Sequence, residues 1–274
     1  MNEELKKLFY EIENSNDREI VIEGFVKIRT ALEKGEIRVA EKINEEWIVN
    51  TWIKSAILLG FRFGVLKDFT GDLWNYIDKD TMPVQNYTSE RAIRLVPGGS
   101  SVRAGAYVAP GSVIMPPSYI NVGAYVDSGT MIDSHALVGS CAQVGKGVHL
   151  SAASQLGGVL EPVGALPVII EDNVFIGGNC GIYEGTIVKK NAVIGTGVIL
   201  NAATSLFDNT SGDYLTKEKD KPLVVPENAV VVAGSRPISK GKGAELGIHV
   251  YTPVIVKYRD DKTEISITLE DVLR

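Results

Sequence analysis

The 274-residue sequence is poor in the side chains that form disulfides and transition-metal sites, with two cysteines and three histidines. Cys141 and Cys180 fall on different turns of a six-residue repeat, so we expect buried free thiols and no disulfide. Of the histidines, His135 and His149 are expected on different faces of that repeat, and His249 lies beyond it. We therefore expect no bound metal.

Positive charge is not in excess either. The 28 lysines and arginines face 34 aspartates and glutamates, and no Lys/Arg-rich run occurs. This balance argues against nucleic acid or an anionic membrane as a partner. No window approaches the roughly 18 apolar residues of a membrane span, and residues 1–19 lack the apolar stretch of a signal peptide. These absences predict a cytoplasmic protein.

What the sequence has in abundance is a period of six. An aliphatic residue occupies every sixth position from Val102 to Leu156 and again from Ile170 to Leu206, followed by Val225 and Val231. This period fits neither an α-helix nor an ordinary strand. Three residues after the aliphatic position, Gly or Asn recurs where a tight turn needs positive φ. These positions are Gly105, Gly111, Gly123, Gly129, Gly147, Asn173, Asn179, Gly185, Asn191 and Gly197. Each hexad predicts a short strand plus a corner, and three hexads predict one triangular coil of a stacked solenoid.

The chain divides into a small α-rich globular domain (1–95), the solenoid (96–236) and a strand-rich C-terminal cap (237–274). In the first domain the spacing predicts helices over 5–12 and 19–34, a hairpin over 37–50, an apolar helix over 51–61 capped by Thr51, and irregular structure over 61–93. The tail from Val250 predicts two or three strands and a terminal helix. Arg91, Arg94 and Arg103 cluster where the domain enters the solenoid, which makes that entry a candidate anion site.

Two insertions interrupt the six-residue register. The spacing from Leu156 to Ile170 suggests about two extruded residues, and that from Leu206 to Val225 about thirteen. Loops that project from a rigid solenoid often carry binding sites.

Several strings resemble a known enzyme family, the tetrahydrodipicolinate N-succinyltransferases. The strings are IRLVPGGSSVRAGAYVAPGSVIMPPSYI (93–120), NVGAYVDSGTMIDSHALVGSCAQVGKGVHLSAASQLGGVLEP (121–162), PVIIEDNVFIG (167–177) and YEGTIV (183–188). The resemblance covers most of the chain. It implies a mainly β fold, a left-handed parallel β-helix, assembled as a homotrimer with active sites between subunits. The implied reaction moves a succinyl group from succinyl-CoA, a co-substrate, to an amino-dicarboxylate, and needs no permanently bound cofactor.

The resemblance also assigns site residues. The substrate arginine of the family matches Arg94, which would clamp an acceptor carboxylate. Its substrate aspartate matches Asp133, which would hold the acceptor ammonium and serve as general base. Glu184 is the second candidate catalytic acid, although the family's second acidic position aligns equally with Gly181.

This chain departs from the family at Ser134 and His135, where DTWA is usual, and at Asn179, where an arginine is usual. The donor or acceptor pocket is therefore open to change, and His135 is a further candidate base. Two other readings compete: acetyl transfer from acetyl-CoA to the same or a related amino-dicarboxylate, and a non-catalytic assembly subunit that kept the solenoid. A zinc site between subunits, as in the related β-helix carbonic anhydrases, is the rival that the scattered histidines disfavour.

Overall fold

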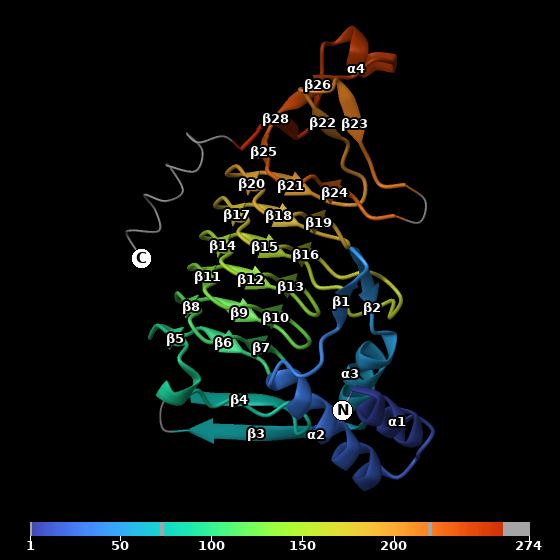
Figure 1. Cartoon of the computed structure of the whole chain (residues 1–274), viewed down its shortest axis with the longest axis vertical. Helices are drawn as coiled ribbons and strands as arrows, with labels where there is room; N and C mark the ends of the chain where they lie inside the picture. Colours follow the sequence, from blue (N-terminus) through green and yellow to red (C-terminus); the bar gives the residue numbers. More distant parts are fainter. Residues whose placement is uncertain (1, 72–73, 219–220, 260–274) are drawn as a thin grey trace.

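The computed structural model describes residues 2–71, 74–218 and 221–259 (Figure 1). A helical N-terminal domain lies at one end and along one side of a tall β-solenoid, and a small group of strands and a short helix lies at the other end. Within the described residues, no helix is both long and apolar enough to cross a bilayer.

The N-terminal domain contains three α-helices and, between the second and third of them, a hairpin. Helices α1 (Asn2–Glu13), α2 (Arg18–Glu33) and α3 (Thr51–Phe63) pack through apolar side chains such as Phe9, Phe25 and Ile57. The antiparallel strands β1 (Ala40–Ile43) and β2 (Glu46–Val49) precede α3. The sequence predictions for both early helices, the hairpin and the apolar helix are confirmed.

Two predictions for this domain are wrong. Thr51 is already helical, and the N-cap of α3 is Asn50, whose side-chain amide donates to Arg38 O and Glu41 Oε1 and leaves the helix without a side-chain cap. The stretch predicted as irregular contains β3 (Leu66–Gly71), antiparallel to β4 (Trp74–Lys79), and a 3-10 turn (Ser89–Arg91). The hairpin shows no apolar alternation because it is largely exposed, including Leu66 and Ile77.

The solenoid has three parallel faces, and successive strands visit them in turn. Face 1 contains β5 (Arg94–Leu95), β8 (Val113–Ile114), β11 (Met131–Ile132), β14 (His149–Leu150), β17 (Phe175–Ile176), β20 (Val193–Ile194) and β25 (Ala229–Val232). Face 2 contains β6 (Ser101–Val102), β9 (Tyr119–Ile120), β12 (Leu137–Val138), β15 (Gln155–Leu156), β18 (Gly181–Ile182) and β21 (Ile199–Leu200). Face 3 contains β7 (Tyr107–Val108), β10 (Tyr125–Val126), β13 (Gln143–Val144), β16 (Ile169–Ile170), β19 (Ile187–Val188) and β24 (Val224–Val225).

This architecture confirms the left-handed parallel β-helix predicted from the repeat and the resemblance. The inward aliphatic column is at most 1% exposed from Ile114 to Leu200. All ten predicted corner positions have positive φ, between 56° and 81°. We name each corner by the faces it joins, so that corner 1–2 leads from face 1 to face 2.

Both insertions are larger than the spacing suggested. The loop 157–168 leads directly from β15 on face 2 to β16 on face 3, so the spacing of fourteen, less six, leaves eight extra residues. A spacing of fourteen fits two repeats plus two as well as one repeat plus eight, and periodicity alone does not separate them. The second insertion starts after β21: the spacing of 25 from Leu200 to Val225, less six, leaves nineteen.

The second insertion forms part of the cap. Leu206 is buried but does not belong to a solenoid coil; it begins β22 (Leu206–Asp208), which pairs with β23 (Asp213–Leu215). The remaining cap elements are β26 (Ser235–Pro237), α4 (Gly241–Glu245), β27 (His249–Tyr251) and β28 (Val254–Tyr258). Strand β28 pairs with both β25 and β22, which ends the parallel ladder of face 1 and confirms the predicted strands of the tail. The predicted terminal helix lies outside the described residues.

The N-terminal domain covers one corner and one face of the solenoid. Ala104, Val122 and Cys141, at corner 2–3, are buried in the same cluster as the helices. On face 3, Ile169 and Ile187 are buried with Ala40 of the hairpin. On the later coils, corner 2–3 is therefore covered by the loop 157–168 and not by the N-terminal domain.

Candidate functional site

Arg94 and Asp133 both lie on face 1. Arg94 begins β5 and is in register with Val113 and Met131, while Asp133 directly follows β11. Side chains alternate along a strand, so both residues lie on the outward side, opposite Ile132. They are two strands and two residues apart, which corresponds to roughly 10 Å across the sheet and roughly 7 Å along it. The two backbone positions are therefore roughly 12 Å apart, a gap that the long Arg94 side chain can partly span.

The Arg94 guanidinium is available to a ligand. The residue is exposed, and its side chain makes no hydrogen bond or ion pair with any other described residue, while its backbone N–H donates to Ser112 O. Its two predicted neighbours are engaged: Arg91 Nη1 donates to Gln85 Oε1, and Arg103 Nη2 forms a 2.7 Å ion pair with Asp78. The predicted arginine cluster therefore contributes one free guanidinium in the described structure.

Asp133 is held by its own turn. Its Oδ1 accepts a 2.6 Å hydrogen bond from Ser134 N, and its backbone N–H donates to Leu150 O. Two residues after Asp133, His135 has a φ of 62° and an exposed side chain, and its N–H donates to Pro117 O. These bonds fix the carboxylate at corner 1–2 and leave Oδ2 without a hydrogen bond from the described residues.

Glu184 lies at corner 2–3 with positive φ, as does Gly185 after it. Its Oε2 accepts a 2.7 Å hydrogen bond from Ala202 N, one coil further along. Glu184 also lines an open pocket of about 780 Å³ between the two insertions. The lining residues are Gly158, Val159, Glu161, Pro162, Gly164, Ala165 and Leu166 from the first insertion, Glu184 and Gly185, and Ala202, Lys217, Lys221 and Pro222 from the second.

The wall formed by the loop 157–168 fits closely against the solenoid. A Cβ atom on Gly185 would lie 2.6 Å from Leu166 O, so position 185 tolerates no side chain. On the other side of the loop, the fully buried Lys54 of α3 donates a 2.6 Å hydrogen bond from Nζ to Ala165 O. Sequence reasoning missed Lys54, because a lysine within an apolar helix gives no signal of what it contacts.

The alternative acidic position, Gly181, has no room for an acid. A Cβ atom there would lie 2.5 Å from Tyr183 Cε2, and a Cβ on Gly157 would lie 2.7 Å from Tyr183 Cδ1. The Tyr183 ring therefore occupies the space above both glycines, and its hydroxyl donates to Gln155 Oε1 at 3.2 Å. Glu184 is the acid that this stretch supplies.

Within one chain, Asp133 and Glu184 do not meet. Asp133 lies at corner 1–2 after β11, whereas Glu184 lies at corner 2–3 after β18, two strands further along face 2 than β12. Neither Arg94 nor Asp133 lines the pocket beside Glu184. A site that uses all three residues requires more than one chain.

The two cysteines and His149, which the sequence also singled out, pack against other residues of the fold. Both cysteines are buried and free, and burial raises the pKa of the Cys141 thiol to about 12. His149 packs edge-on against Phe175 on face 1. Across residues 2–71, 74–218 and 221–259, no three His, Cys, Asp or Glu side chains gather as a metal site would require.

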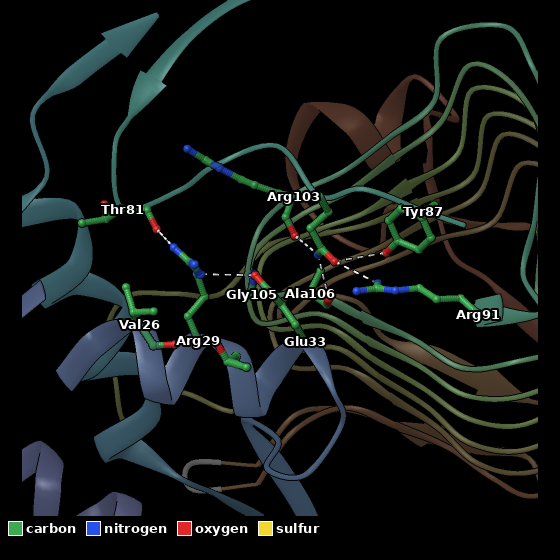
Figure 2. A network of polar contacts seen from close by, with 11 residues as sticks. Val26, Arg29, Glu33, Thr81, Tyr87, Arg91, Arg103, Gly105 and Ala106 are labelled. Carbon is green, nitrogen blue, oxygen red and sulfur yellow. Dashed lines mark hydrogen bonds and ion pairs between the residues drawn. The ribbon is translucent and has the colours of Figure 1, made fainter. Parts of the chain in front are cut away.

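A polar network connects the N-terminal domain to the first coil of the solenoid, which begins at Arg94 (Figure 2). Arg29 Nη1 donates to Thr81 O, and Arg29 Nε lies 3.3 Å from Glu33 Oε1. The same Glu33 oxygen accepts from Gly105 N at 2.9 Å. Gln85 Nε2 donates to Arg103 O and Ala106 O, so the segment that leads into Arg94 is fastened to the first coil.

Comparison with known proteins identifies the same family twice. Residues 1–63 match the family model of the tetrahydrodipicolinate N-succinyltransferase N-terminal domain, and residues 167–202 match the hexapeptide repeat of succinyl-transferase. The 2,3,4,5-tetrahydropyridine-2,6-dicarboxylate N-succinyltransferase of Legionella pneumophila is 41% identical over 93% of this chain and 89% of that protein. The protein of the same name from Shewanella amazonensis is 44% identical over 89% of this chain and 85% of that protein.

One solved structure, described as a putative 2,3,4,5-tetrahydropyridine-2-carboxylate N-succinyltransferase from Campylobacter jejuni, aligns with a TM-score of 0.44 at 16% identity. The alignment covers 85% of this chain and 62% of that chain. Identity above 40% over nine-tenths of the sequence, together with the two family models, fixes the assignment. The chain belongs to the tetrahydrodipicolinate N-succinyltransferase family.

Proposed function

We propose that this protein transfers a succinyl group from succinyl-CoA to the amino group of L-2-amino-6-oxopimelate, the ring-opened form of tetrahydrodipicolinate, in diaminopimelate and lysine biosynthesis. The observation that carries the proposal is the 41–44% identity, over about nine-tenths of this chain, to proteins named for that reaction. Succinyl-CoA acts as a co-substrate, and we propose the cytoplasm as the place of the reaction.

The chemistry needs few protein groups. The acceptor ammonium loses one proton to become a neutral amine, which attacks the thioester carbonyl carbon. The C–N bond forms, the nitrogen loses its second proton, the C–S bond breaks, and CoA leaves as a thiolate that takes up a proton. The protein must bind the acceptor carboxylates, accept the ammonium proton and stabilise the oxyanion. No permanently bound cofactor is required for these steps.

We assign carboxylate binding to Arg94, whose guanidinium is exposed and free to make a bidentate contact. Asp133 would hold the acceptor ammonium and accept its proton, because its Oδ1 is fixed by Ser134 N while Oδ2 is open. Glu184 would orient the amine from the pocket between the insertions, with its other oxygen fixed by Ala202 N.

This assignment requires oligomerisation, and we propose a homotrimer with active sites between subunits. The separation of Asp133 and Glu184 on different corners supports it, because a second chain is needed to bring them together. The outward side chains of face 1 also support it. Val113, Met131, Phe175 and Val193, with His149 between Met131 and Phe175, form a partly exposed and mainly apolar ladder along the solenoid axis, which is suited to burial against another copy.

The donor is tested by measuring thiol release with succinyl-CoA and, separately, with acetyl-CoA, using 2-aminopimelate as a stable acceptor and mass spectrometry of the product. The proposal expects N-succinyl-2-aminopimelate, with a higher kcat/KM for succinyl-CoA. A preference for acetyl-CoA would reassign the donor. Release with neither would mean that Ser134, His135 and Asn179 mark a changed acceptor or lost catalysis.

A further inference from the structure

A second charged cavity lies away from Arg94, Asp133 and Glu184, between the hairpin β1–β2 and face 3. Its volume is about 270 Å³. The lining residues are Arg38, Lys42 and Trp47 from the hairpin region, and Asp127, Gly145, Lys146, Ile170, Glu171, Asp172 and Lys190 from the solenoid. We propose that this cavity binds an α-amino acid, with the ligand carboxylate on Arg38 and the ligand ammonium on Asp127 and Asp172.

The Arg38 guanidinium is held in position without an anion. Its carbon lies 3.8 Å from the centre of the Tyr125 ring, and its Nε donates a 2.9 Å hydrogen bond to Gln143 Oε1. Gln143 is itself fully buried and is held by a 2.8 Å bond from Nε2 to Cys141 O. Stacking and hydrogen bonding therefore fix the plane of the guanidinium before any ligand arrives.

The terminal nitrogens of Arg38 remain open. Neither Nη1 nor Nη2 makes a hydrogen bond or ion pair with another described residue. Burial lowers the pKa of Arg38, although Tyr125 and Asp127 act in the opposite direction. Charges taken out of water are normally paired, and a planar guanidinium with two free nitrogens matches a carboxylate. This wall of the cavity calls for an anionic group.

The opposite wall carries the carboxylates of Asp127 and Asp172 beside the exposed Lys146. Asp127 Oδ1 accepts from Ser128 N, and Asp172 Oδ1 accepts from Lys146 N, so each carboxylate is fixed through one oxygen. The Oδ2 atoms make no hydrogen bond within the described structure. Both carboxylates act on Arg38 electrostatically but form no ion pair with it, so a gap separates the two walls. A ligand with a carboxylate at one end and an ammonium nearby would complete both.

The third acid in the cavity is already occupied. Glu171 Oε1 accepts from Trp47 Nε1 and pairs with Lys42, and its Oε2 accepts from Lys190 N. These contacts fasten the hairpin to face 3 and shape the cavity without using Asp127 or Asp172. An oxyanion such as phosphate would meet the two free carboxylates at close range, which disfavours it.

The first experiment measures thermal unfolding of the full chain with L-alanine, L-norvaline, L-methionine or L-lysine at millimolar concentration. Pentanoate and butylamine serve as matched controls, since each lacks one charged group of norvaline, and inorganic phosphate tests for a simple anion site. A ligand that binds only the folded chain raises the midpoint. We expect at least one amino acid to do so while the three controls do not. No shift with any amino acid, or an equal shift with phosphate or pentanoate, would overturn the proposal.

The second experiment places the ligand by equilibrium dialysis of that amino acid. Arg38→Met should weaken binding by at least about tenfold, the loss of roughly one charge-assisted pair. The double variant Asp127→Asn/Asp172→Asn should do the same, and it retains both Oδ1 acceptors, so its fold is preserved. Arg94→Met should bind as the native chain does. If Arg94→Met abolishes binding, or if both cavity variants bind normally, the ligand occupies the acceptor site and the cavity proposal is wrong.

Discussion

Lys54 Nζ, on α3, donates a 2.6 Å hydrogen bond to the backbone carbonyl of Ala165, in the loop that lines the pocket beside Glu184. Lys54 is fully buried and forms no ion pair with a described carboxylate. Burial lowers the pKa of its ammonium, an effect that the Cys141 thiol only partly opposes. The N-terminal domain therefore holds the pocket loop through a charged group in an unfavourable environment.

This environment predicts a pH effect on stability. Because the pKa of Lys54 is lower in the folded chain, the folded chain loses this proton at a lower pH than the unfolded chain does. Stability should therefore rise as pH increases from the lowered folded pKa toward the ordinary value of 10.5. We expect the thermal midpoint of the native chain to improve relative to Lys54→Met between neutral pH and about pH 10. If the thermal midpoints of the two proteins changed with pH in the same way, the charge of Lys54 would have no effect on stability.

The network in Figure 2 predicts an asymmetry between two glutamates of α2. Glu33→Gln removes the charge opposite the largely buried Arg29 and weakens the bond from Gly105 N, so it should cost about 1–3 kcal/mol of unfolding free energy. Glu23→Gln is the control, because its pair with Lys27 is 57% and 75% exposed and should contribute less than about 1 kcal/mol. Denaturant unfolding of both variants tests the difference. Equal losses would contradict the structural role of Glu33.

Removing the Tyr183 ring should restore stability to variants that carry a side chain at position 181. Gly181→Ala places a Cβ atom 2.5 Å from Tyr183 Cε2, which forces the ring away and should cost on the order of 1 kcal/mol. In a Tyr183→Ala background the same change should be tolerated, so the double variant should be more stable than the sum of the single losses. Gly157→Ala should behave in the same way, because its Cβ meets the other edge of the ring. If the double variant lost as much stability as the two single variants together, the ring would not occupy this space.

The division of the site between corners predicts complementation between subunits. Asp133→Asn and Glu184→Gln should each lose most activity when homogeneous. Unfolding and refolding the two variants together should restore part of it, because some interfaces would then combine an intact Asp133 with an intact Glu184. The control is each variant refolded alone. Recovery no greater than in those controls would place both acids in one subunit's site or remove one from the reaction.

The period of six predicted the solenoid and all ten corner positions because each coil repeats the same local requirements: an inward aliphatic side chain and a corner residue that accepts positive φ. Features that depend on contacts between distant parts of the chain could not be predicted as well from the sequence. The loop 157–168 was underestimated because its length is compatible with two registers. Leu206 fits the period although it begins β22, a strand of the cap, where it pairs with Leu215. The hairpin β3–β4 has no buried face to leave a pattern.

The same difference between local patterns and long-range contacts applies to the candidate site. Arg94, Asp133 and Glu184 were predicted from similarity to family strings and stay predictions, and the structure adds that Gly181 is overlain by Tyr183. Residues that act through long-range contacts gave no signal in the sequence. Lys54 meets Ala165 across 111 positions, and Arg38 meets Gln143 across 105, so neither contact follows from spacing.

The most direct test compares kcat/KM for succinyl-CoA with 2-aminopimelate as acceptor in the native protein and in Asp133→Asn. Asparagine keeps an Oδ1 acceptor for Ser134 N, so the corner is preserved while the base and the negative charge are removed. We predict that kcat/KM falls by roughly 10²–10⁴, the usual contribution of a general base, with the thermal midpoint unchanged. Turnover at the native rate in Asp133→Asn would contradict the account, because the carboxylate would then have no part in the transfer.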